Sequence, residues 1–280
     1  MSVPVIPHLH GGGSPWFTDN FEFGRVSAWA YEGQENAPRI ITDPTNGSNR
    51  VLNSEISRPA TPYRSGNARS ELRFDGDNLN ERYLPWFSKV SLQYRMYIHA
   101  DHDFNGNHQN IFSQLHGPPT CKISSPCMAL YIQDNYMNLV CRGQQHYHVG
   151  SNTKNEYASW ADSTNGTYTT NGVYTLSKGQ WYYFVIDMTY DYKLNSEGGS
   201  GLVKIYVNQG SVPNATHLRL EHREQMGYHE DLSMYMKIGI YAFPWRKQKN
   251  IDQDVIDGYG RFRLLFDDVV WDKQHKLASQ

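Results

Sequence analysis

The sequence predicts an all-β fold, built as a jelly-roll-like sandwich of two packed antiparallel sheets. Two features favour this class: apolar and polar residues alternate with period 2 in short runs separated by Gly, Asn, Asp and Pro, and helical periodicity is scarce. The chain has 280 residues, of which 39% are hydrophobic and 14% aromatic, a composition that allows a sizeable core and favours strands. We therefore expect residues 1–280 to form a single domain, with residues 1–15 as a flexible N-terminal arm.

The expected strands follow one another along the chain with turn signals between them. Gly- and Asp-containing turns stand at 75–77, 198–201 and 257–260. Residues 151–173 are rich in Ser, Thr and Asn and are expected to form a long loop. The runs that alternate as strands are 50–56, 69–75, 90–99, 110–116, 128–133, 181–189, 202–208, 234–241 and 261–271.

Charge, hydropathy and cysteines bear on partners and compartment. The 26 basic and 28 acidic residues give a net charge of −2 without a basic block, so nucleic acid is not expected as a partner. No apolar run approaches the roughly 20 residues of a membrane span, and no signal peptide is visible. We favour a secreted or extracellular monomer, in which Cys121 could pair with Cys127 and leave Cys141 free; three reduced thiols are the open alternative.

Several expected strands place polar, ionisable side chains on one face. Because successive side chains of a strand point to opposite faces, Arg69, Glu71 and Arg73 share a face, and so do Gln114 and His116. In residues 234–241 the same rule places Tyr235, Lys237, Gly239 and Tyr241 on one face and Met236, Ile238 and Ile240 on the other. In residues 90–99 it places Gln93, Arg95, Tyr97 and His99 opposite Leu92, Tyr94, Met96 and Ile98. In residues 110–116, Ile111, Ser113 and Leu115 lie on the face opposite Gln114.

These polar faces have two interpretations. An antiparallel sheet often has one wet face, which explains the polar alternation of any single strand. The residue types favour a functional face instead, because Arg, Gln, His, Lys and Tyr stand where Thr, Ser, Lys and Glu are usual. Gly239, between Lys237 and Tyr241, would also let a ligand approach the backbone closely. If the strands are neighbours, their faces combine into one groove.

That inventory suits the cleavage of a uronic-acid polymer by β-elimination. The reaction removes the proton from the carbon next to a carboxylate and expels the glycosidic oxygen. Arg and Gln donors, or a protonated His, can stabilise the negative charge that develops beside the carboxylate. A base must take the proton and an acid must protonate the leaving oxygen. Tyr or neutral His can be the base and Tyr the acid, and no metal is required for this chemistry.

Three motifs give a specific resemblance. In chain order, Arg69-Ser-Glu-Leu-Arg73, Gln114-Leu-His116 and Lys237-Ile-Gly-Ile-Tyr241 resemble the signature strands of the β-jelly-roll polysaccharide lyases, such as family 7 alginate lyases, glucuronan lyases and heparin lyase I. In the family 7 alginate lyases these strands read R-[ST]-E-L-R, Q-[IV]-H and Y-F-K-A-G-x-Y. Residues 266–271 are similar to the last strand of concanavalin-like sandwiches. The resemblance implies a concanavalin-like β-jelly-roll with a concave substrate groove.

The resemblance also implies an activity and roles for the matched residues. The chain would cleave an anionic uronate polysaccharide, alginate or glucuronan first, and leave 4,5-unsaturated uronate ends. Arg69 and Gln114 would grip the substrate carboxylate, His116 would be base or carboxylate neutraliser, and Tyr241 would be acid, or both acid and base. The expected substrate-binding residues are Arg73 and Lys237 at neighbouring subsites, Glu71 holding the arginines, and Tyr235 and Arg95.

Two departures from the family pattern leave the polymer open. Leu115 stands where the alginate lyases carry Ile or Val, at a position linked in that family to guluronate or mannuronate preference. The third motif lacks the polar residue that commonly follows the family's Tyr, here Tyr241. Glucuronan therefore competes with alginate, and a heparin- or heparan-type glycosaminoglycan is the alternative.

Metal binding is not strongly indicated. Glu22 and Asp268 are weak candidates for a structural Ca²⁺ where the chain ends would meet, as in some sandwich families that the chain resembles. The string HADHD, 99–103, matches no structural zinc spacing, and we do not expect a metal there.

Two other functions are compatible with a β-sandwich. A glycoside hydrolase would need two carboxylates flanking the scissile bond, and no E-x-D-x-x-E-like strand is present. A non-catalytic lectin would have little need for a matched set of Arg, Gln, His and Tyr.

Overall fold

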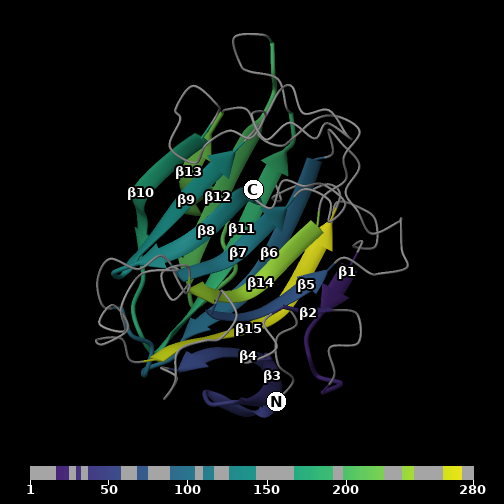
Figure 1. The fold of residues 1–280 in the computed structure, drawn as a ribbon, viewed down its shortest axis with the longest axis vertical. Coiled ribbons are helices and arrows are strands. Elements are labelled where there is room, and N and C mark those ends of the chain that lie inside the picture. Colours follow the sequence, from purple (N-terminus) through teal and green to yellow (C-terminus); the bar gives the residue numbers. More distant parts are fainter. Residues whose placement is uncertain are drawn as a thin grey trace, which may run out of the picture.

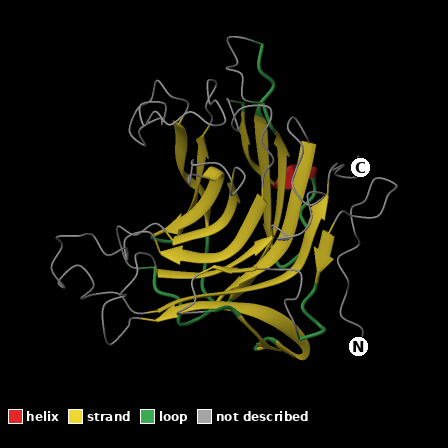
Figure 2. Cartoon of the chain, turned by 45° about the vertical axis from the view of Figure 1, so that its right-hand side comes forward, coloured by secondary structure: helices red, strands yellow, loops and turns green. Residues whose placement is uncertain are grey.

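A computed structural model of the chain shows two antiparallel sheets (Figure 1). It describes residues 17–24, 30–32, 37–57, 68–74, 89–104, 110–116, 126–142, 167–191, 198–223, 235–242 and 261–272. Within these residues strands dominate, and the helical element is a short 3₁₀ helix at Ala215–His217, red in Figure 2. The predicted all-β, two-sheet class is confirmed.

The larger sheet has eight strands, and its two longest strands lie side by side within it. The N-terminal strand β1 (Phe17–Asp19) pairs with β15 (Arg261–Asp272), so the two ends of the described chain meet in this sheet. The order across the rest is β13 (Leu218–His222), β12 (Leu202–Gln209), β11 (Gln180–Thr189), β6 (Lys89–Ile98), β15, β4 (Asn46–Ser57) and β3 (Arg39–Asp43).

The seven-stranded sheet contains all three strands that carry the sequence motifs. Figure 1 shows β7, β14 and β5 side by side in this sheet, with β14 in the middle. The full order is β10 (Thr167–Thr175), β9 (Tyr136–Arg142), β8 (Pro126–Gln133), β7 (Asn110–His116), β14 (Tyr235–Ala242), β5 (Ala68–Phe74) and β2 (Ala30–Glu32).

All nine predicted strands are present, with small shifts at their ends. The expected loop at 151–173 is wrong in its last part, because residues 167–173 belong to β10, which pairs antiparallel with β9. Residues 151–166 and 1–15 lie outside the described residues. Strands β1, β2, β3, β9 and β13 were not predicted; four of them are only three to five residues long and so offer little alternation to read.

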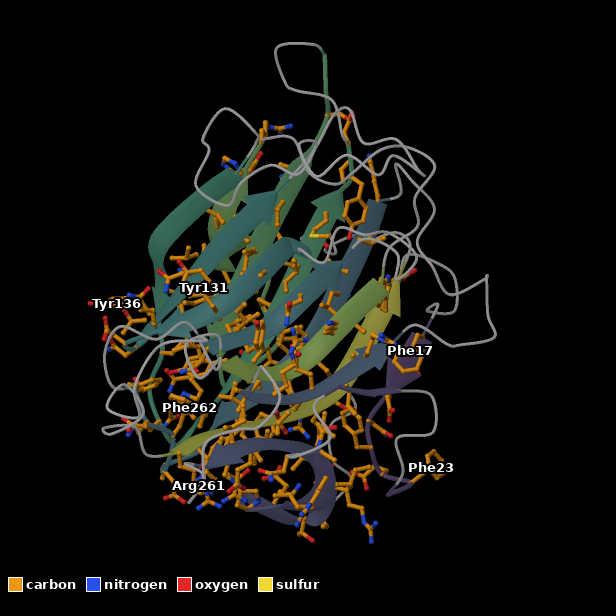
Figure 3. All side chains as sticks on the ribbon, in the orientation of Figure 1. Phe17, Phe23, Tyr131, Tyr136, Arg261 and Phe262 are labelled. Atoms are coloured by element: carbon orange, nitrogen blue, oxygen red, sulfur yellow. The ribbon has the colours of Figure 1, made fainter. Side chains whose placement is uncertain are left out.

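Both sheets contribute to one hydrophobic core. Met236, Ile238 and Ile240 of β14 are fully buried there, opposite the polar face of the same strand, as the alternation predicts. From the larger sheet, Tyr94 stacks on Phe184 with ring centroids 5.1 Å apart. Burial of this kind is the main favourable term in folding. In contrast Phe23, 85% exposed, points away from the ribbon (Figure 3).

The strands β7 and β14 each contain an irregularity that alternation did not predict. Ile111 was expected on the core face, but Phe112 is buried in the core and Ile111 is half-buried. The register of β7 with β8 shifts between Ile111 and Ser113, and the register of β14 with β7 shifts between Ile238 and Tyr241. Such bulges insert a residue, bend the strand and increase its twist. They bring Tyr241 opposite Ile111 on β7.

The cysteine and membrane predictions are answered only in part. Cys141 is buried and forms no disulfide. Cys121 and the side chain of Cys127 lie outside the described residues, so their pairing stays a prediction. Among the described residues, no helix has the length and apolar character needed to cross a membrane.

Candidate active site

The motif residues lie together because β14 pairs with both other motif strands. On one side Lys237 lies opposite Arg73 and Tyr241 lies opposite Arg69, both on β5. On the other side Lys237 lies opposite Gln114 of β7. Directly paired residues in a sheet project from the same face. The five side chains therefore belong to one surface, as the sequence predicted for neighbouring strands.

Glu71 connects the two residues expected to grip a substrate carboxylate. Its Oε2 atom accepts a hydrogen bond from Nη1 of Arg69 at 3.1 Å, and its Oε1 atom accepts a short hydrogen bond from Nε2 of Gln114. Glu71 and Gln114 are each 1% exposed. A buried carboxylate is stable only when it is paired and hydrogen-bonded. The contacts agree with the holding role expected for Glu71 and extend it to Gln114.

Arg69 and Tyr241 are in direct contact. The Arg69 Cζ atom lies 4.0 Å from the centroid of the Tyr241 ring, within the range of a cation–π interaction. Tyr241 is 8% exposed, so the guanidinium and the neighbouring strands hold the phenol ring in place. An arginine that could bind a carboxylate and a phenol that could move a proton thus stand side by side.

The charges on this face favour an anionic ligand. Arg69, Arg73 and Lys237 supply three cationic side chains, with Glu71 among them and Glu32 of β2 paired with Glu71 in the backbone register. Lys237 is 3% exposed, and charges held in such a low-dielectric position act strongly on a ligand that displaces water. These groups have the chemistry to donate hydrogen bonds to a carboxylate.

The two remaining motif residues, His116 and Tyr235, occupy the same end of this face. Their backbones pair with each other, at the end of β7 and the start of β14. Their side chains lie outside the described residues, so the roles expected for them stay predictions.

Arg95 is not part of this face, which corrects the sequence interpretation. Its strand β6 belongs to the larger sheet, where Arg95 lies opposite Asp267 of β15. The guanidinium pairs with Asp267, contacts Asp268 at 3.0 Å from its Nε atom, and lies over the Trp181 ring at 4.6 Å. Burial, followed by the charge of Asp268, raises the pKa of Asp267 to about 7. The alternating pattern of β6 was right, but the pattern did not tell which sheet the strand joins.

The candidate calcium ligands are also engaged with other groups. Asp268 binds Arg95, and a Glu22 carboxylate oxygen accepts the backbone N–H of Arg50 at 3.0 Å. In the part of the chain that the structure describes, no cluster of His, Cys, Asp and Glu could hold a metal ion. In the string at 99–103, His102 is fully buried, its Nδ1 bonds the Arg263 backbone, and burial lowers its pKa to about 4. Structural calcium at Glu22 and Asp268 therefore stays a prediction.

Sequence reasoning missed a connection between the sheets beneath the site. The hydroxyl of Ser54, on β4, donates to the backbone oxygen of Ser70, and the Ser70 hydroxyl accepts the Glu55 N–H at 3.1 Å. Because Ser70 alternates with Arg69 and Glu71, the sequence predicts that its side chain faces the core. The sequence does not predict that the contact there is with β4. The sequence interpretation had linked Gly239 to close approach of a ligand. The structure adds a packing reason, because a Cβ atom there would lie 2.3 Å from the Ser70 oxygen.

A two-sheet β-sandwich that carries Arg, Gln, Lys and Tyr on one face is compatible with an enzyme that acts on a carbohydrate. The comparison with protein families agrees: a family model described as polysaccharide lyase matches residues 21–259. The chain therefore belongs to the polysaccharide lyase family and is an enzyme that cleaves a polysaccharide. A search of curated protein sequences found no match.

Solved structures of lyases share the fold. An endo-β-1,4-glucuronan lyase from the fungus Trichoderma reesei is 15% identical, with a TM-score of 0.67 over 93% of this chain and 96% of that one. A marine PL-14 alginate lyase from Aplysia kurodai is 13% identical, with a TM-score of 0.58 over 94% of this chain and 100% of that one. At these identities the likeness concerns the fold.

Proposed function

We propose that this lyase cleaves a uronic-acid-containing anionic polysaccharide by β-elimination and leaves a 4,5-unsaturated uronate at the new non-reducing end of each cleavage. Glucuronan and alginate are the first candidate substrates. One observation carries the proposal: Glu71 holds Arg69 and Gln114 on one face, with Tyr241 under the Arg69 guanidinium.

The first requirement of the reaction is to stabilise charge beside the substrate carboxylate. When the C5 proton leaves, the electrons move toward a carboxylate that is already negative. Arg69 and Gln114 would donate to its oxygens, and charge-assisted bonds of this kind are stronger than neutral ones. Lys237 and Arg73 lie in register on the same sheet and would bind the adjacent sugar carboxylates. Donors fixed before the reaction lower the barrier because they need no reorganisation.

The second requirement is to move two protons. A base takes the C5 proton, the C4–O bond breaks, a C4=C5 double bond forms, and the departing glycosidic oxygen receives a proton. Tyr241 would give that proton, and either Tyr241 or His116 would be the base. The contact between Arg69 and the Tyr241 ring supports this assignment, because it keeps the phenol next to the carboxylate-binding pair.

The substrate class is supported by similarity and by one buried position. The glucuronan lyase and the alginate lyase named above act on two different uronate polymers and share the fold, so both polymers are tested first. Leu115, at the position linked by resemblance to sugar preference, is 1% exposed and packs in the core. Its influence on the substrate would therefore act through the placement of β7. A heparin- or heparan-type polymer remains the alternative.

The test is ultraviolet absorbance during incubation with a panel of polymers. The panel contains polyguluronate, polymannuronate, glucuronan, heparin, heparan sulfate, hyaluronan and a neutral glucan. β-Elimination makes a conjugated uronate that absorbs, whereas hydrolysis makes reducing ends without absorbance. Rising absorbance on a uronate polymer supports the proposal and names the substrate; new reducing ends without absorbance, or binding without cleavage, would overturn it.

The role of Tyr241 needs a matched variant. Tyr241→Phe removes only the phenol oxygen, so turnover should fall at least about 10³-fold while polymer binding persists. Tyr206→Phe is the control, since Tyr206 is 7% exposed, close to the 8% of Tyr241, but lies on β12 of the other sheet. Equal activity of the two variants would remove Tyr241 from the mechanism. Secretion, a monomeric state and structural calcium stay predictions.

A further inference from the structure

We propose that Gly239 and Glu71 act as a positioning pair for this reaction. Gly239 lets β14 pack closely against the β5 backbone at Glu71, and the Glu71 carboxylate reaches over β14 to fix the side-chain amide of Gln114 with its N–H side toward Glu71. The inference rests on the proposed function, because it explains how that site presents its donors to a substrate carboxylate. Neither residue needs to touch the reacting atoms.

The first step of the argument is the distance that Glu71 must cover. Glu71 is on β5 and Gln114 is on β7, and β14 lies between these strands. Neighbouring strands are about 4.8 Å apart, so the two backbones are separated by roughly 10 Å. The hydrogen bond between the two side chains therefore passes over β14.

The second step is what β14 presents at that level. The residue paired with Glu71 is Gly239, between Lys237 and Tyr241 on the same face. A larger residue at this position would place its Cβ atom against the backbone of β5. With φ at +132°, an added Cβ would lie 2.6 Å from the Glu71 Cα atom. The close packing of β14 against the Glu71 backbone, from which the Glu71 side chain starts, thus depends on glycine.

The third step is the chemistry of the contact. An ionised carboxylate only accepts hydrogen bonds, so it can bind the Nε2 side of Gln114 but not its Oε1 atom. The bond uses one of the two N–H groups of that nitrogen and fixes the orientation of the amide. The opposite orientation would bring two oxygen acceptors together in a buried place, which is costly. Glu71 therefore selects the orientation in which Gln114 can donate to an anion.

The fourth step is that hydrogen bonds to the other sheet fix the backbone next to Glu71. The backbone oxygen of its neighbour Ser70 accepts a hydrogen bond from Ser54, and the Ser70 hydroxyl accepts the N–H of Glu55, both on β4 of the other sheet. The Glu71 backbone is thus held by the opposite sheet on one side and by Gly239 on the other. A side chain that starts from a fixed backbone loses little further freedom when it binds Arg69 and Gln114.

The first test is Glu71→Gln, with Glu55→Gln as the matched control. Glu55 also pairs with an arginine, Arg261, at 2.5 Å, but in the larger, eight-stranded sheet. The Glu71 variant keeps the shape but allows the Gln114 amide to turn over. On the polymer that the wild type cleaves, kcat should fall about 10- to 100-fold while KM stays the same or falls, because a negative charge has left the binding face. The Glu55 variant should keep the wild-type values, and equal values for all three proteins would overturn the proposal.

The second test exchanges the two side chains, in the double variant Glu71→Gln with Gln114→Glu. It can keep a hydrogen bond between positions 71 and 114 but moves the carboxylate to the position that faces the substrate anion. We expect lower activity than in Glu71→Gln alone. Restored activity would show that any hydrogen bond across β14 suffices, and would refute the orienting role.

A measurement without substrate separates this inference from the proposed function. The side-chain amide signals of Gln114 can be assigned by ¹⁵N NMR from their loss in Gln114→Leu. In the wild type one of the two amide protons should be shifted downfield by its bond to the carboxylate. That shift should disappear in Glu71→Gln and persist in Glu55→Gln. An unchanged signal in Glu71→Gln would overturn the positioning pair even if lyase activity on uronate polymers were established.

Discussion

Replacement of Gly239 by alanine should destabilise the fold more than any other Gly→Ala change at a described position in the seven-stranded sheet. Two effects add at this position. The φ of +132° lies where residues with a Cβ atom are rarely found, and the new Cβ would lie 2.3 Å from the Ser70 backbone oxygen. Ser70 cannot retreat easily, because the Ser54 hydroxyl binds the same oxygen from the opposite sheet.

The magnitude follows from these two contributions. A strained backbone conformation costs about 1–3 kcal/mol, and overpacking costs about 1–3 kcal/mol, so we expect a loss of roughly 2–6 kcal/mol. Two control glycines separate the contributions. Gly172→Ala has φ at +69° with no atom within 4 Å and carries the strain alone, whereas Gly47→Ala has neither problem. The control at Gly47 should be neutral or stabilising by up to about 1 kcal/mol, because alanine restricts the unfolded chain.

Urea denaturation followed by tryptophan fluorescence measures the three free energies of unfolding. Total stabilities of domains are about 5–15 kcal/mol, so Gly239→Ala could lose a large share and still be measurable. The expected order of destabilisation is Gly239, then Gly172, then Gly47. If Gly239→Ala were no less stable than Gly172→Ala, the close contact with β5 would not exist as described, and the argument for the positioning pair would fail with it.

Three further outcomes are expected. Arg69→Lys keeps the positive charge but loses the planar guanidinium that covers the Tyr241 ring. We expect kcat/KM on the cleaved polymer to fall roughly 10- to 100-fold, with an unchanged free energy of unfolding. An unchanged kcat/KM would show that the charge alone suffices. Burial lowers the pKa of His102 from 6.5 to about 4. The contribution of this residue to the free energy of unfolding should therefore be complete above pH 6.5 and fall by up to about 3 kcal/mol as the pH drops toward 4. His102→Gln should flatten that pH profile of urea unfolding, and an equally steep profile would assign the acid sensitivity to other groups. Leu115→Ile conserves volume in the core and should cost under about 1.5 kcal/mol in unfolding, while the ratio of rates on two uronate polymers should change; a constant ratio would remove this position from substrate choice.

Alternation predicted the strands and their faces because it is a local property. The buried side of β14 and the polar side of β5 follow from the sequence residue by residue, and the structure confirms both. The site residues came from the same reading, joined to the motif resemblance. Strand pairing is not local, and the error at Arg95 shows the consequence: β6 has a polar face like that of β5, but it pairs with β15 and β11 in the other sheet. The bulge at Ile111 was equally hidden, since an inserted residue changes the face without changing composition.

The two arginines show what distinguishes a structural site from a binding face in this fold. Arg95 pairs with two carboxylates, Asp267 and Asp268, which neutralise its charge within the larger sheet. Arg69 contacts one carboxylate, Glu71, which is shared with Gln114, and two more cations stand in register on the same strands. The carboxylate at Arg69 thus also binds an amide of the candidate site, whereas the carboxylates at Arg95 belong to the larger sheet. The Asp267-Asp268 pair was visible in the sequence, and it could not be matched to Arg95 until the order of the strands was known.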